Sequence, residues 1–200
     1  MPTYTPTALL QDLQLQTENI LDKAVGHWQM IPPESLLRAP GENRWSAAQC
    51  LEHLNSYGRY YLPAIEKAIS AAEQKGPAPS PTFTSGWLGH YFYQLMLPKE
   101  KGMKKMKAPK DHIPASNLDS DAVLREFIDQ QEQLLLLLER AKGIDPGRAK
   151  VAISIAPFLK LKLGDVFLFL VAHHQRHVLQ AEKAMGISDV GFRISAPSKQ

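Results

Sequence analysis

The chain has 200 residues, 44% of them hydrophobic and 22% charged, which is ordinary for a soluble globular protein. Its net charge is only +3, and it has no run of 18 apolar residues, so the composition excludes a membrane-spanning helix. This length fits one domain, 1–200, with enough interior for a full core.

The single cysteine and the N-terminus indicate where the protein resides. Cys50 excludes an internal disulfide, which fits a reducing compartment. Residues 1–4 have neither a basic start nor an apolar stretch, so we expect no signal peptide. The sequence therefore predicts a cytoplasmic protein with no membrane partner.

Four segments have the apolar spacing of amphipathic helices: residues 8–31, 47–74, 121–142 and 165–185. Pro32 and Pro33 follow the first segment and would end that helix. Ser46 and Gln49 form a capping-box pattern at the start of the second. We predict an all-α fold, a four-helix bundle with a long crossover between helices 2 and 3.

The crossover, residues 76–119, contains several prolines and is the least regular part of the chain. Residues 86–97 are rich in aromatic residues and predict a short helix, with Trp87, Tyr91 and Phe92 holding the crossover against the core. Residues 147–162 are interpreted as another connection. We expect no strands.

Six lysines crowd the crossover and account for much of the positive charge. They are Lys99, Lys101, Lys104, Lys105, Lys107 and Lys110. A charge run of this kind is usually a solvated loop, and this one lacks the spaced aromatic residues of a base-stacking surface. We therefore expect no nucleic-acid partner.

Three histidines lie in a five-residue stretch of the fourth helix, residues 173–177. His173 and His177 are four residues apart, so they share one helix face and can reach one metal ion. His174 and His177 form a poorer alternative pair. The shared face is apolar, so two imidazoles there need partners. Either a metal ion binds them, or they are hydrogen-bonded core histidines.

His53, on the second helix, is the best candidate for a third ligand, because facing helices of a bundle can build one site. The alternative interpretation is that His53 binds no metal and lies at the edge of the helix interface. Gln49 and Gln180 could orient the ligands, although a helix cap and a surface amide are the simpler interpretations. We treat the remaining histidines as surface or loop residues, with His90 the nearest to a pocket; they are His27, His90 and His112.

Two segments resemble the DinB/YfiT-like superfamily. Residues 45–54, WSAAQCLEHL, match its pattern Trp-Ser-x-x-(Glu/Gln)-x-(Leu/Ile)-x-His-(Leu/Ile). Residues 173–180, HHQRHVLQ, match its second pattern, His-x-x-x-His followed by Gln. Both segments occur in the family's order and at a plausible separation.

The resemblance implies a four-helix bundle whose divalent metal ion, zinc or nickel, is held by His53, His173 and His177. Members of the superfamily include thiol-dependent S-transferases, a maleylpyruvate isomerase and proteins described as metal-dependent hydrolases, and some are homodimers. It therefore implies a small-molecule substrate, a low-molecular-weight thiol as partner, and a homodimer. A metal-dependent hydrolase and a non-catalytic, stress-related binding module are the alternatives.

Overall fold

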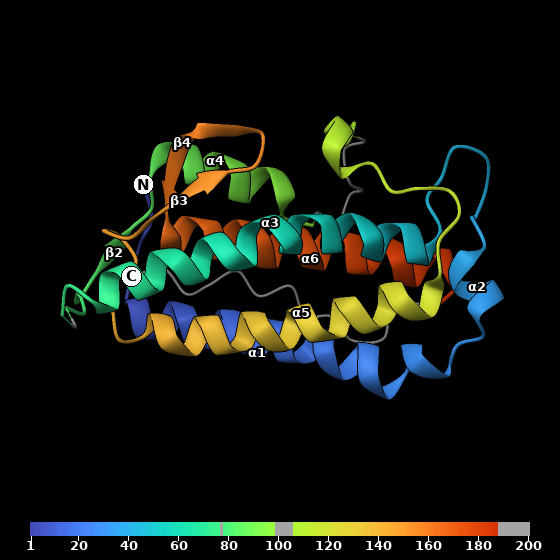
Figure 1. The fold of residues 1–200 in the computed structure, drawn as a ribbon, viewed down its shortest axis with the longest axis horizontal. Coiled ribbons are helices and arrows are strands. Elements are labelled where there is room, and N and C mark those ends of the chain that lie inside the picture. The colour runs from blue at the N-terminus through green and yellow to red at the C-terminus, as the bar shows by residue number, and fades with distance from the viewer. Residues whose placement is uncertain (77, 99–105, 188–200) are drawn as a thin grey trace.

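The computed structural model describes residues 1–76, 78–98 and 106–187. The chain is mostly helical, as predicted, and four long helices run alongside one another (Figure 1). These are α1 (Pro6–Gly26), α3 (Ala47–Glu73), α5 (Ser120–Ala141) and α6 (Leu163–Ala184). Helix α3 packs against α5 and α6, and α1 also packs against α5 and α6. Shorter helical segments are η1 (Trp28–Met30), α2 (Pro33–Leu37), α4 (Trp87–Met96) and η2 (Lys110–His112).

The helix ends follow from local chemistry. In α3, the Ser46 side chain accepts from the Gln49 N–H while the Gln49 side chain accepts from the Ser46 N–H, so the predicted capping box is present. The N-cap of α5 is Asp119, whose carboxylate accepts from two backbone N–H groups. The predicted first helix is too long, because α1 ends at Gly26.

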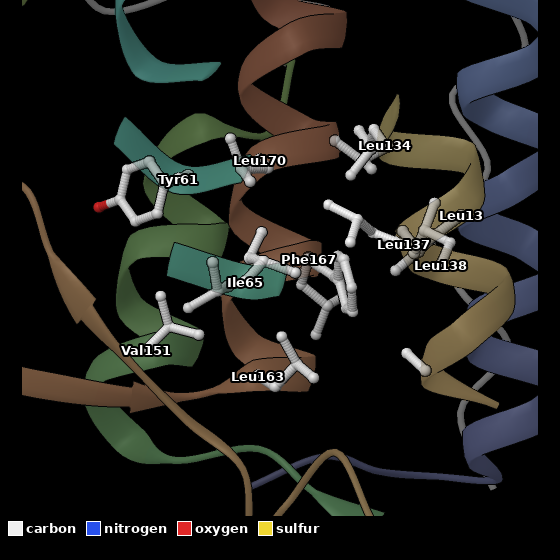
Figure 2. Close-up of a cluster of buried hydrophobic side chains, with 14 of the residues drawn as sticks. Leu13, Tyr61, Ile65, Leu134, Leu137, Leu138, Val151, Leu163, Phe167 and Leu170 are labelled. Carbon is white, nitrogen blue, oxygen red and sulfur yellow. The ribbon is translucent and has the colours of Figure 1, made fainter. Parts of the chain in front are cut away.

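Two apolar clusters fill the interior. The larger one surrounds Phe167 of α6, which lies between α3 and α4 on one side and α1 and α5 on the other (Figure 2). The second contains Trp28, Leu51 and Phe127. Between the two clusters, α6 buries five consecutive polar side chains, from His173 to His177. A polar layer therefore crosses the apolar interior, and its donors and acceptors need partners.

The prediction that the chain contains no strands was wrong. Residues 147–162, interpreted as a connection, contain the antiparallel hairpin of β3 (Lys150–Ile153) and β4 (Ala156–Lys162). A second small sheet pairs β1 (Thr3–Tyr4) with β2 (Phe83–Thr84). The β3–β4 hairpin packs against α3, α4 and α6, which supplies the burial that an isolated hairpin lacks.

The short helix predicted in the crossover is present as α4, but two of its predicted anchors are wrong. Trp87 is 72% exposed and Tyr91 is 56% exposed, whereas Tyr93 is buried. Phe92 is half-buried and packs against the larger core cluster.

Of the six crossover lysines, only Lys107 and Lys110 belong to the described residues, and both are exposed. Lys99, Lys101, Lys104 and Lys105 lie outside them. Within the described ranges, no helix is both long and apolar enough to cross a membrane.

Candidate metal centre

The structure brings the three predicted histidines together between α3 and α6. His53, His173 and His177 each offer one ring nitrogen, and these nitrogens all lie within 4.8 Å of one another. All three side chains are buried, with exposed fractions of 3%, 3% and 9%. The four-residue spacing on α6 brings His173 and His177 together, with their rings edge to face, and the packing of α3 on α6 supplies the third.

One ring nitrogen of His53 faces the cluster and the other is held by the backbone. Its Nδ1 lies 2.7 Å from the carbonyl oxygen of His112. A carbonyl oxygen only accepts, so Nδ1 carries the hydrogen and Nε2 presents a lone pair. That Nε2 lies 3.2 Å from Nε2 of His173.

His177 is oriented in the same way by a side chain. Its Nδ1 donates to Oε1 of Gln180 across 3.1 Å, which leaves Nε2 for the cluster. Gln180 therefore has the orienting contact proposed for it. Gln49 does not, because its side chain completes the α3 cap and donates to the carbonyl oxygen of Ala115.

His173 is the most enclosed of the three. The Phe169 ring stacks on it with centroids 5.5 Å apart, and the Tyr57 ring meets it at 4.5 Å. Its Nδ1 is buried and forms no hydrogen bond with any residue that the structure describes. The orientation of this ring therefore depends on aromatic packing and on the contact of its Nε2 with His53.

Burial keeps these imidazoles neutral at pH 7. Desolvation lowers the pKa of His53 to about 4 and that of His177 to about 3. The pKa of His173 is lowered well below 6.5 by burial first, and then by its neighbours His177 and His53. The neutral form is the one that binds metal ions, so these residues are ready to act as ligands.

The donor set fits a divalent ion. Zinc–imidazole bonds of about 2.0–2.1 Å at tetrahedral angles place two ligand nitrogens about 3.3 Å apart, close to the 3.2 Å between His53 and His173. Without an ion, two lone pairs would face each other across that distance unless one Nε2 carried a hydrogen. The hydrogen bonds to the His112 carbonyl and to Gln180 are those that usually hold metal-binding histidines in place.

His174 does not belong to this group. Its Nδ1 lies 3.0 Å from Oε1 of Gln131, and its side chain is buried. The alternative pair of His174 and His177 is therefore not formed, and His174 is a hydrogen-bonded core histidine.

The sequence prediction for His112 was wrong. This residue is 7% exposed and its ring stacks on Tyr57 at 3.8 Å. Its Nδ1 pairs with Oγ of Ser56 and its Nε2 with Oγ of Ser154. His112 thus holds His53 through its backbone and joins α3 to the β3–β4 hairpin through its ring. No spacing rule links residues 59 positions apart, so the sequence carried no signal for it.

A family model matches most of the chain. The model of the DinB superfamily matches residues 16–181. The chain belongs to the DinB superfamily. The three clustered histidines of this DinB chain, His53, His173 and His177, lie within the matched range, as do Gln180 and His112. No curated protein and no solved structure matches the chain.

Proposed function

We propose that this DinB chain is a metal-dependent S-transferase, with residues 1–200 forming one four-helix-bundle domain crossed between helices 2 and 3. His53, His173 and His177 would hold one zinc or nickel ion. The observation that supports this most is the convergence of three neutral, buried imidazoles, each with one ring nitrogen within 4.8 Å of the other two. A purely structural role would not require three imidazole nitrogens to converge on one point.

The bound ion would supply Lewis-acid chemistry, because it lowers the pKa of a thiol or a water molecule in its open coordination position. The chain's own residues orient the ligands and limit access to them. The His112 carbonyl and Gln180 fix two of the imidazoles. The Trp45 ring covers His53 and His177, with centroid distances of 5.0 and 6.0 Å.

In the proposed reaction, the sulfur of a low-molecular-weight thiol attacks an electrophilic carbon of a small substrate. A carbon–sulfur bond forms, the bond to the leaving group breaks, and the leaving group departs with the bonding pair. The thiol proton passes to water. No external oxidant or reductant is needed.

The test uses cobalt-substituted protein with cysteine, glutathione and coenzyme A as thiols, and 1-chloro-2,4-dinitrobenzene as electrophile. We expect a thiolate-to-cobalt absorption band and thioether formation with at least one thiol. His177→Ala should lose both signals. His27→Ala, which removes an exposed imidazole, should keep them.

Absence of both signals with every thiol would overturn the transferase proposal. Metal-dependent release of 4-nitrophenol from its esters would then favour the hydrolase. A tightly held ion with neither activity would favour a binding module. Sedimentation velocity on the same sample tests the homodimer that the resemblance implies.

A further inference from the structure

A pocket lies beside the histidine cluster, between α3, α4, α6 and the β3–β4 hairpin. Its volume is about 130 Å³. The floor is buried and almost entirely apolar, and it is formed by Tyr57, Tyr61, Ile153 and Leu161. The mouth is formed by exposed residues, which are Met106, Lys107 and Ile155. The pocket therefore has an apolar interior and one cation at its rim.

The pocket and the histidine cluster share a wall. Tyr57 and Phe169 line the pocket, and both rings also pack against His173. Tyr57 additionally contacts the ring of His53, with centroids 5.1 Å apart. A molecule lying against these two rings would place its inner end next to the proposed metal ion.

Two polar groups of the pocket have no partner among the residues that the structure describes. The Tyr57 hydroxyl forms no hydrogen bond with them, although Tyr57 is only 7% exposed. The Lys107 ammonium forms no ion pair with them. By contrast, the hydroxyl of Tyr61 already accepts from the backbone N–H of Ser154, and Figure 2 shows it directed away from the apolar cluster. The unused groups are thus the hydroxyl of Tyr57 on the floor and a cation at the mouth.

We propose that this pocket binds the substrate that accepts the sulfur, and that this substrate is a small carboxylate with an aromatic or branched apolar body. The body would fill the floor, the carboxylate would pair with Lys107, and the electrophilic carbon would lie at the Tyr57 end. The assignment of this molecule as a substrate rests on the proposed transferase function.

The size of the pocket limits the body to about one ring. A cavity of about 150 Å³ lined by apolar side chains holds benzene, and this pocket is slightly smaller but open at its mouth. A pocket with mostly apolar walls and a few placed polar groups is the usual form of a small-molecule site. An uncharged apolar ligand would leave Lys107 unused, and a cationic one would be repelled by it.

The test compares three ligands of one size on the zinc-loaded protein by saturation-transfer NMR titration: phenylacetate, 2-phenylethanol and 2-phenylethylamine. An exposed ion pair contributes about 1.4- to fivefold in affinity, and repulsion of the amine by Lys107 contributes a similar factor. We therefore expect phenylacetate to bind about three- to tenfold more tightly than the amine. Lys107→Met should reduce that ratio to below about twofold. Lys110→Met, which removes an equal charge from η2 outside the pocket, should leave it unchanged.

Leu95→Trp fills the α4 wall of the pocket and should weaken all three ligands. Circular dichroism and zinc content confirm that each variant folds. A phenylacetate preference that survives Lys107→Met would overturn the assignment of the lysine, because the carboxylate would then lie elsewhere, for example on zinc. Binding unaffected by Leu95→Trp would overturn the pocket.

The two proposals fail separately. Stoichiometric zinc without phenylacetate binding would refute the pocket and leave the metal site intact. Lys107-dependent phenylacetate binding in a protein that holds no metal would support the pocket and refute the metal-dependent function.

Discussion

Replacing Gln180 by leucine tests whether the hydrogen bonds around the histidines serve metal binding. The change keeps a side chain of similar size but removes the Oε1 that accepts from Nδ1 of His177 across 3.1 Å. Loss of such an orienting partner costs about 10- to 100-fold in metal affinity, or about 1.4 to 2.7 kcal/mol. The pKa of His177 is about 3, so protons do not compete at pH 7 and the loss reports orientation alone.

The assay is competition for zinc against a chromophoric chelator at pH 7. Lys183→Ala is the matched control, because Lys183 is an exposed residue on the same helix. We expect Gln180→Leu to weaken zinc binding by at least about tenfold and Lys183→Ala by less than about twofold. Equal affinities of the wild type and Gln180→Leu would refute the idea that Gln180 fixes a ligand.

Three further predictions concern the fold around the site. Burial raises the pKa of Cys50 to about 12, so an aromatic disulfide reagent should label this thiol only after denaturation; rapid labelling of the native protein would contradict this. In Gly164→Ala the new Cβ would lie 2.6 Å from the buried Phe83 ring, and we expect a loss of about 1–3 kcal/mol in thermal unfolding, whereas Gly26→Ala, with open space around it, should cost nothing. In metal-free protein, His53 and His174 have folded pKa values of about 4, below the unfolded value of 6.5. The unfolded state therefore binds more protons between pH 6.5 and 4, and the free energy of unfolding falls as the pH drops through that window. Urea titrations should show a loss of about 2 kcal/mol per histidine at pH 5, and a free energy of unfolding that stays constant over this range would refute buried neutral histidines.

The sequence predicted the clustering of His53, His173 and His177, which the structure contains, because the signals for these histidines are local. His173 and His177 share a face by helix geometry alone, and residues 45–54 and 173–180 carry the family patterns. The long helices followed from apolar spacing and, in α3, from a capping box that the structure contains.

The surroundings of the site could not be predicted, because they depend on contacts between distant segments. The carbonyl that holds His53 comes from His112, in a crossover without periodicity. The β3–β4 hairpin was missed because its strands do not alternate clearly: Phe158 is 84% exposed and Leu159 is 39% exposed, so apolar residues lie on the solvent side. The same hairpin contributes Ile153 and Leu161 to the pocket floor, so the pocket was missed with it.

Elemental analysis of the untagged protein, purified without added metal or chelator, tests the central claim most directly. It should be made on the wild type, on His53→Ala/His177→Ala, and on His27→Ala as a control for the loss of an exposed imidazole. A three-histidine site predicts about one zinc or nickel ion per chain in the wild type and the control, and none in the double variant. A wild type that neither contains nor takes up either metal, or a double variant that keeps a full equivalent, would contradict the proposed centre.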